Sequence, residues 1–415
     1  MSMVSSKYNI FDCFIFFLIA SLAAGNLFGS LQLPRVVAML LGIPCLIKMP
    51  VFKEVLGDLR IWAVLFLLYS FVSCLWTPAG IDEGLIASVY NLVHFLLFTE
   101  IIVFSRFARN PMKAITLGFL VALSATAAIG FWEIMTDNHL STSKLDEARA
   151  SGPGIDEAYV RFFAASTFYN LNTYVTFICF ILPFLFWGGI NKDNSLIIRF
   201  FYLLAIVIAI ILVLFNGSRG GLLAMAIMAL VYFYFSVFKL KQSVFSILLL
   251  ITLLVVVFSY YGPIILNTLL MRFEIQGAFQ EETRFVIWRN ALKASSDYLF
   301  LGCGAGGMEF AMLKYANGGV SVAHNVFLEV LSEYGIVFTG GLVFYLYMIF
   351  KRGRRMMDIP RKMCIYQAII AFPIIGIINS GYLTGPILWA FLASLYVIAN
   401  YEHIKSVNKV LCQVT

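Results

Sequence analysis

The chain has 415 residues, of which 61% are hydrophobic and only 12% are charged, and its formal net charge is +7. Soluble domains carry about 25% charged residues, so this composition excludes a water-soluble globular protein. The seven cysteines are scattered, without a CxxC pair or a metal-binding spacing, and so indicate neither a disulfide framework nor a zinc site.

Long apolar runs separated by short polar segments recur along the whole chain. A helix needs about 20 residues to cross the hydrocarbon, whereas the strands of a membrane barrel would alternate in polarity. We therefore predict an all-α membrane protein, a single polytopic domain over 1–415. Its expected transmembrane helices, about twelve, lie near 10–29, 34–49, 59–77, 86–104, 113–133, 168–189, 197–215, 220–238, 244–261, 325–350, 364–380 and 385–402. The first run has no signal-peptide cleavage site and is expected to stay as a span.

The positions of lysine and arginine predict the orientation. With both termini in the cytoplasm, 19 of the 29 basic residues fall in inner segments, and every inner loop is basic. The net charge is then a topology signal, and we expect no nucleic acid to bind. This orientation leaves a smaller outer loop at 136–163 and a large outer loop at 262–324, the latter with amphipathic helices that cover the ends of the spans.

The stretch LFNGSRGGLLAM places Arg219 in an outer turn between two predicted spans. Gly217, Gly220 and Gly221 allow a tight turn and a close approach of the backbone to a ligand, and the helix that begins there favours an anion. Arginine forms forked contacts with phosphate, so this turn is a candidate phosphate site. The alternative is an interfacial arginine that reaches lipid headgroups.

The stretch ETRFVIWRNALKASSDY has apolar residues at helical spacing and predicts an amphipathic helix. Arg284 and Arg289 are five positions apart on it, so they point roughly 140° from each other. We expect Arg284 to face the glycine-rich turn LGCGAGG and to bind an anion. Arg289 is expected to meet solvent or a carboxylate, with anion binding as its alternative role.

His324 begins a predicted span on the outer side, next to Asn325 and one turn before Glu329. An imidazole with its ordinary pKa near 6.5 is largely neutral at neutral pH, so His324 is a candidate base that Glu329 could orient. A helix-capping His-Asn pair is the alternative. At the mouth of another span, Arg161 and Asn172 offer polar groups that suit a sugar or simple capping. Arg289, Asn325 and Glu329 are further candidates for substrate binding.

The order of these motifs resembles that of a known family. Arg161 precedes two asparagines that open one span, SRGG opens another, and TRFVIW, LGCGAGG and HNVFLEVLSEYGI lead into a third. This pattern is similar to the bacterial O-antigen ligase and O-antigen polymerase superfamily, whose members transfer glycans from undecaprenyl diphosphate on the outer face of the inner membrane. The resemblance is strongest over residues 161–340.

The resemblance implies a metal-independent glycosyltransferase of the bacterial inner membrane, with a GT-C-like fold, a periplasmic active site and no cofactor. Arg219 and Arg284 would hold the donor diphosphate, and His324 would activate the acceptor hydroxyl for an inverting displacement. The acceptor would be a lipid A core sugar in a ligase, or a second lipid-linked repeat unit in a polymerase. We favour the ligase on overall length and loop arrangement.

A lipid or glycan transporter is the main alternative of a different class. Transporters tend to place ionisable residues near the bilayer midplane, in broken helices of related halves. Here the arginines and His324 map to one face, as a surface transferase requires. A structural or regulatory membrane protein would have no reason to gather them there.

Overall fold

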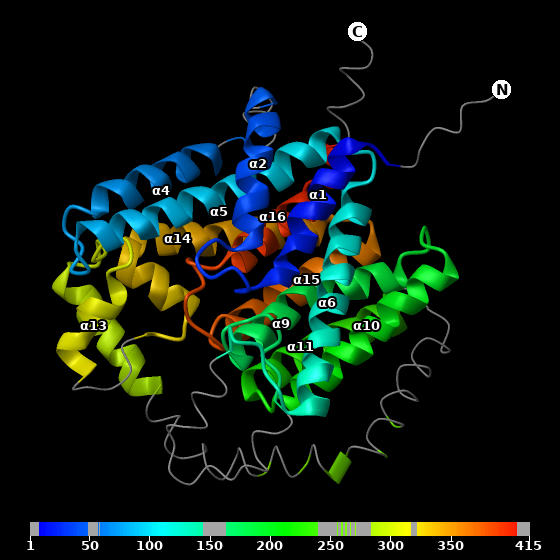
Figure 1. The fold of residues 1–415 in the computed structure, drawn as a ribbon. Helices are drawn as coiled ribbons and strands as arrows, with labels where there is room; N and C mark the ends of the chain where they lie inside the picture. The colour runs from blue at the N-terminus through cyan, green and yellow to red at the C-terminus, as the bar shows by residue number, and fades with distance from the viewer. Residues whose placement is uncertain are drawn as a thin grey trace, which may run out of the picture.

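The structure is a computed structural model that describes residues 8–48, 57, 59–143, 163–239, 284–316 and 322–404, together with 255, 259, 262, 263, 266 and 270. Throughout these residues the chain consists of helices and turns, with no β-strand (Figure 1). The predicted all-α class is therefore confirmed for this part of the chain, while a GT-C-like architecture stays a prediction.

The helices follow the apolar runs of the sequence. Each predicted span coincides with a helix, except 244–261, which lies outside the described residues apart from two single positions. The helices are α1 (Ile10–Ala20), α2 (Leu33–Ile47), α4 (Leu59–Ser73), α5 (Ile81–Phe107), α6 (Pro111–Thr136), α9 (Leu171–Ile190), α10 (Leu196–Phe215), α11 (Arg219–Tyr234), α13 (Met308–Ala316), α14 (Val326–Arg355), α15 (Ile359–Ile375) and α16 (Pro386–Ala399). Two short elements, η1 (Ser21–Ala24) and η3 (Phe235–Lys239), continue α1 and α11, and a further helix covers 284–297.

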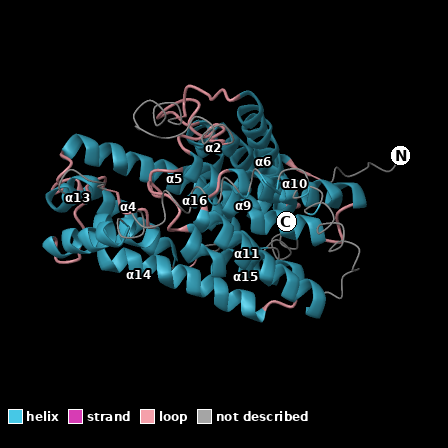
Figure 2. Cartoon of the chain, turned by 90° about the horizontal axis from the view of Figure 1, so that it is seen from below, coloured by secondary structure: helices cyan, strands magenta, loops and turns pink. Residues whose placement is uncertain are grey.

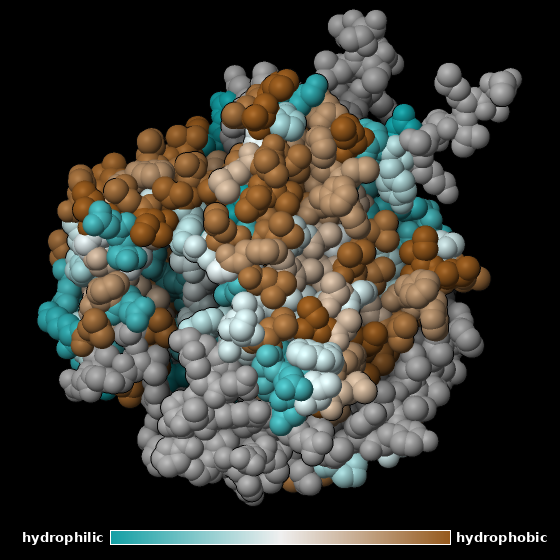
Figure 3. Space-filling view, in the orientation of Figure 1, coloured by the Kyte–Doolittle hydropathy of each residue, from teal (hydrophilic) through white to brown (hydrophobic). Residues whose placement is uncertain are grey.

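Six helices are long and apolar enough to cross a membrane, namely α5, α6, α9, α10, α11 with its continuation, and α14. Helices α1, α2, α4 and α16 are apolar but shorter, so the predicted number of twelve spans is not confirmed. On α2, Leu40, Ile43 and Ile47 are about 70% exposed, and Figure 3 shows apolar side chains over this helix. An exposed apolar helix face fits contact with lipid and supports a multi-pass membrane protein.

Helix α9 lies in the middle of the bundle (Figure 2). Every residue from Tyr174 to Ile190 is buried, because α6, α10, α11, α15 and α16 all contact this helix. A helix that is hydrophobic all round is typical of such a central position. The rings of Phe180 and Phe391 lie 4.5 Å apart between centroids and hold α16 against it.

Those turns predicted to be cytoplasmic that the structure describes lie together at one end of the bundle. Arg106, in the last turn of α5, donates a hydrogen bond to the Ile404 carbonyl beyond α16 at 3.1 Å. Lys113, at the start of α6, donates to the Asp193 carbonyl in the α9–α10 turn at 3.1 Å. An ion pair also joins Arg361, in the first turn of α15, to Glu402 after α16. We call this the basic end.

The turns predicted to be periplasmic lie at the opposite end, which we call the site end. The Ala164 amide donates to Asn216 in the α10–α11 turn at 2.9 Å. Asn379, between α15 and α16, donates to Thr173 at the start of α9 at 2.9 Å. The turns thus alternate between two ends as the charge pattern predicts. Which end faces the periplasm stays a prediction.

A small helical lobe covers the site end of α4, α5 and α14, at the left of Figure 1. It contains the helix over 284–297, the glycine-rich turn over 302–307 and α13, packed around a separate cluster of small and apolar side chains. Apart from four single positions near 262–270, the described residues of the predicted large periplasmic loop lie in or next to this lobe. The described residues that follow it lead directly into α14.

Candidate functional site

His324 lies at the site end, just before α14 begins. Its φ of +45° falls in the left-handed region that non-glycine residues seldom adopt, and such outliers gather at functional sites. The side chain is half-buried, and its Nδ1 has no hydrogen-bond partner among the described residues. Burial, and secondarily the positive charge of Arg284, lower its pKa below the ordinary 6.5. The imidazole is therefore neutral at neutral pH and can accept a proton.

The helix over 284–297 brings Arg284 to His324. The Trp288 indole N–H donates to the Ala323 carbonyl at 3.0 Å, which fixes this helix against the residue before His324. Arg284 precedes Trp288 by one turn, and its charge acts on the imidazole. Arg289, on the same helix, is exposed. The two arginines thus differ in position as the helical spacing predicts.

Arg219 is the first residue of α11 and is half-buried. The helix begins there because the Ser218 hydroxyl accepts a hydrogen bond from the Gly221 amide at 3.3 Å, as an N-cap does. A Cβ on Gly221 would lie 2.4 Å from Val175, and one on Gly220 would lie 2.9 Å from Ile378. The two glycines of SRGG therefore let α9 and the α15–α16 connection approach the turn that carries Arg219.

The α15–α16 connection joins the Arg219 turn to the His324 segment. Ile378 packs on Gly220, next to Arg219, and two residues earlier the Gly376 carbonyl accepts a hydrogen bond from the Val326 amide at 2.8 Å. Val326 is two residues after His324. The beginnings of α11 and α14 are thus linked through residues 376–378 of one connection. Arg219, Arg284 and His324 all lie at the site end.

Glu329 does not orient His324 as the sequence suggested. Its carboxylate is buried and accepts hydrogen bonds from the backbone amides of Gly381, Tyr382 and Leu383, at 3.1, 3.2 and 2.9 Å. Both of its oxygens are used in this way. Glu329 therefore acts as a clamp that holds the α15–α16 connection against α14.

Asn325 caps α14. Its side-chain oxygen accepts from the amides of Phe327 and Leu328 at 2.9 and 3.4 Å, so the expected capping role applies to Asn325 and not to His324. Asn172 lies half-buried in the first turn of α9, which Asn170 caps instead. Arg161 lies outside the described residues.

The glycine-rich turn packs on α14, and whether Arg284 faces this turn stays a prediction. The amides of Cys303 and Gly304 donate to the carbonyls of Ser332 and Glu333 in α14, at 2.7 and 3.0 Å. These carbonyls are free because α14 is interrupted at Gly335, whose φ is +80°. The glycines of the turn allow this close backbone contact. The turn holds the lobe in place.

Arg35 and His94 form a buried polar network to which the sequence analysis gave no role. The Arg35 Nε donates to His94 Nε2 at 3.0 Å, and a second guanidinium nitrogen donates to the Thr384 carbonyl at 2.7 Å. His94 Nδ1 lies 3.1 Å from the Leu383 carbonyl, which fixes the imidazole as the donor there. Together with Glu329, these residues hold the α15–α16 connection from three sides. The sequence did offer a sign of this network, namely an arginine inside the predicted span 34–49. Ionisable residues within a membrane span are rare and usually have a partner or a function.

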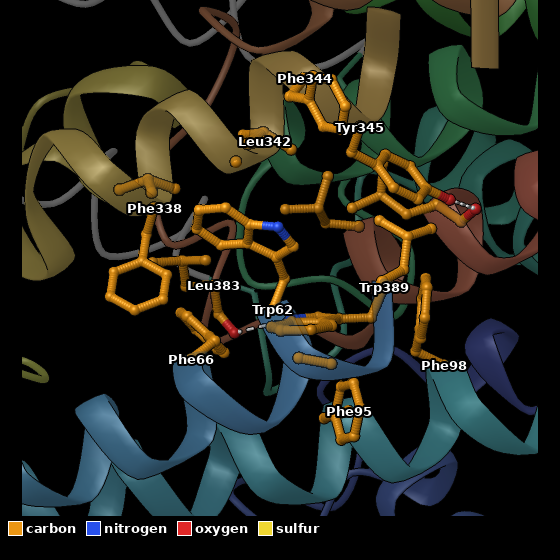
Figure 4. Close-up of a pocket in the computed structure, with 16 residues that line it drawn as sticks. Trp62, Phe66, Phe95, Phe98, Phe338, Leu342, Phe344, Tyr345, Leu383 and Trp389 are labelled. Atoms are coloured by element: carbon orange, nitrogen blue, oxygen red, sulfur yellow. Dashed lines mark hydrogen bonds between the residues drawn. The ribbon is translucent and has the colours of Figure 1, made fainter. Parts of the chain in front are cut away.

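An apolar cavity of about 170 Å³ lies between α4, α5, α14 and α16 (Figure 4). Trp62, Phe95, Phe338 and Trp389 line it, and Trp389 donates to the Leu383 carbonyl at 3.3 Å. Trp62 is 42% exposed, so the cavity opens at the outer surface of the bundle. It leads from an apolar surface toward the connection that Glu329 clamps.

In the part of the chain that the structure describes, no group of three or more His, Cys, Asp or Glu side chains is placed to hold a metal ion. At the site end, the guanidinium groups of Arg219 and Arg284 have the charge and the hydrogen-bond donors that suit a diphosphate.

A protein-family model matches part of the chain. Residues 204–346 match the family described as O-antigen ligase, a stretch that runs from α10 to the middle of α14 and includes Arg219, Arg284 and His324. A search of curated proteins found no match to the chain. The resemblance of this chain to the O-antigen ligase and O-antigen polymerase superfamily is thereby confirmed.

Proposed function

We propose that the protein is a membrane glycosyltransferase that moves a glycan from undecaprenyl diphosphate to an acceptor hydroxyl, with the active site on the periplasmic side of the bacterial inner membrane. The observation that carries this proposal is the hydrogen bond from Trp288 to the Ala323 carbonyl, which places the helix that bears Arg284 against the half-buried His324 at the site end. The family match over the same residues supports it.

In this proposal the two arginines hold the diphosphate of the donor. Guanidinium groups neutralise the charge that grows on a leaving diphosphate, and this stabilisation is greatest in a site with restricted water. The free N–H groups at the beginning of α11 favour an anion beside Arg219. The apolar cavity between α4, α5, α14 and α16 offers a place for part of the isoprenoid chain.

His324 acts as the base. The acceptor oxygen forms a bond to the anomeric carbon while its proton passes to the neutral imidazole, and the bond from that carbon to the diphosphate oxygen breaks with inversion. Undecaprenyl diphosphate leaves with its electron pair, and His324 returns the proton to water. The low pKa of the imidazole keeps it ready for the next turnover at neutral pH.

The identity of the acceptor distinguishes an O-antigen ligase from a polymerase. A lipid A core sugar makes the protein an O-antigen ligase, which we favour, and a second lipid-linked repeat unit makes it a polymerase. Purified protein reconstituted in liposomes with a lipid-linked glycan, and offered both acceptors in competition, should join the glycan to the core sugar. Elongated lipid-linked product alone would establish the polymerase instead.

His324→Ala gives the control for this reconstitution. The variant should insert and fold but transfer no glycan to either acceptor, and a chelator should leave the wild-type rate unchanged. Normal transfer by His324→Ala would remove the base from the mechanism. Transfer that stops with the chelator would reveal a metal requirement.

A further inference from the structure

A second polar pocket lies at the basic end, far from the proposed transfer site along α14. It has a volume of about 660 Å³ and is formed where α14 ends, α15 begins and α16 ends. Among its lining residues are Arg352, Arg355, Met357, Arg361 and Glu402. Three separate parts of the chain therefore build one cavity with several guanidinium groups.

The acids in this pocket are already engaged. Arg361 Nε lies 2.7 Å from the Asp358 carboxylate, and another of its nitrogens lies 2.6 Å from Glu402. These contacts fix Arg361 as one wall of the cavity. Among the described residues, neither Arg352 nor Arg355 forms an ion pair, so no carboxylate offsets the positive charge of these two side chains.

The surrounding segment adds to the positive potential. Residues 351–362 contain six basic side chains and one acidic side chain, namely Lys351, Arg352, Arg354, Arg355, Arg361, Lys362 and Asp358. Like charges at this density repel each other unless an anion lies among them. The pocket thus favours a ligand with at least one negative charge.

The pocket also has features of a membrane–water boundary. Met357 is 91% exposed beside the arginines, and the Arg352 guanidinium lies 5.9 Å above the ring of Tyr396 on α16. Tyrosine rings are enriched where helices leave the hydrocarbon. An exposed methionine next to basic residues suits an amphiphile better than a fully hydrated ion.

We propose that this pocket binds the phosphodiester headgroup of an anionic membrane phospholipid in the cytoplasmic leaflet. Arg352 and Arg355 contact the phosphate, Arg361 closes one side, and Met357 contacts the glycerol and upper acyl chains. Basic pockets between transmembrane helices on the cytoplasmic side are suited to this recognition. The site is distinct from the proposed glycosyltransferase site, because it lies at the opposite end of α14.

The test uses the full-length protein, freed of lipid in a neutral detergent and titrated with phosphatidylglycerol or phosphatidylcholine. Native mass spectrometry measures the bound lipid. The pocket variant is Arg352→Gln with Arg355→Gln. The matched control is Lys48→Gln with Lys192→Gln, which removes two positive charges from the same end of the bundle but outside the pocket.

Phosphatidylglycerol should bind the wild type and the control equally, and the pocket variant roughly 30-fold more weakly. Phosphatidylcholine should bind all three poorly. Equal loss of binding in the control would overturn the pocket and leave only a general charge effect. Displacement of phosphatidylglycerol by an equal concentration of inorganic phosphate would overturn the lipid assignment in favour of a free-anion site.

Folding of the variants is checked separately. Arg355 is exposed, so Arg355→Gln alone should unfold at the wild-type temperature and still bind phosphatidylglycerol more weakly. Wild-type binding by this single variant and by the double variant would contradict the proposal. The measurement does not involve glycan transfer, so it stands apart from the proposed enzymatic function.

Discussion

His324 combines an unusual backbone conformation, partial burial and a nearby positive charge. Each of these has a structural cost, because a left-handed residue is strained and a buried imidazole loses hydration. A helix cap needs none of them, and Asn325 already provides the cap of α14. Capping therefore does not account for these features of His324, and they agree with the base that we propose.

The pH dependence of transfer tests the approach of Arg284 to His324. Only the neutral imidazole accepts a proton, so the rate should be constant through neutral pH and fall on the acid side, below the ordinary pKa of 6.5. Arg284→Gln removes one of the two causes that lower the pKa, so it should move the acid limb of kcat/KM to higher pH.

Arg289→Gln is the matched control for the shape of this profile. Arg289 is exposed on the same helix, so its loss should leave the acid limb in place. If the limb is equally placed in the wild type and both variants, Arg284 does not act on the base.

Replacement of Arg219 by lysine tests forked phosphate contact. Arg219→Lys keeps the charge at the beginning of α11 but loses the planar pair of donors, so transfer should fall roughly 100-fold. The rate of transfer under saturating acceptor measures this loss. Arg289→Lys should retain activity close to the wild type. Wild-type rates for Arg219→Lys would indicate an arginine that only meets lipid headgroups.

At the scale of elements, the α15–α16 connection is the part of the fold that positions the site. Glu329 holds it by three amides, Arg35 and His94 hold its far side, and Ile378 packs against the Arg219 turn. The sequence could not predict this arrangement, because backbone amides and carbonyls carry no residue-specific signal. Glu329 therefore looked like a partner for the histidine one turn before it.

Glycine substitutions test the close packing around SRGG. In Gly221→Ala the added Cβ would lie 2.4 Å from Val175, which α9 cannot relieve without moving, so the variant should lose about 1–3 kcal/mol of stability. Gly340→Ala, in open space on α14, should be neutral or gain up to about 1 kcal/mol. Thermal unfolding in detergent measures both. Equal effects of the two substitutions would show that the turn is not tightly packed.

For the whole molecule, the helices were predictable because long apolar runs have few alternatives to a helix in lipid. The positions where the helices end were harder to predict from the sequence. Helix α15 ends at Ile375, before the predicted limit of 380, because the connection that follows must reach both Gly220 and Val326. The meeting of Arg284 and His324 also depends on tertiary packing, since forty positions separate them in the chain and helical periodicity extends over only a few turns.

The orientation of the bundle can be tested with single cysteines. Asn138→Cys and Ser296→Cys lie at the site end, and Lys192→Cys and Met357→Cys lie at the basic end, all at exposed positions. In intact spheroplasts a membrane-impermeant maleimide should label the first pair above the background of the unchanged protein. It should label the second pair only after permeabilisation. The reverse pattern would place the proposed site in the cytoplasm.

The central claim is that Arg219 and Arg284 hold one diphosphate beside His324. The affinity of purified protein for undecaprenyl diphosphate, without a glycan, tests it most directly. Arg219→Gln and Arg284→Gln should each weaken binding by about tenfold or more, while Arg289→Gln binds as the wild type does. Unchanged affinity in the first two variants, or an equal loss in Arg289→Gln, would contradict the account.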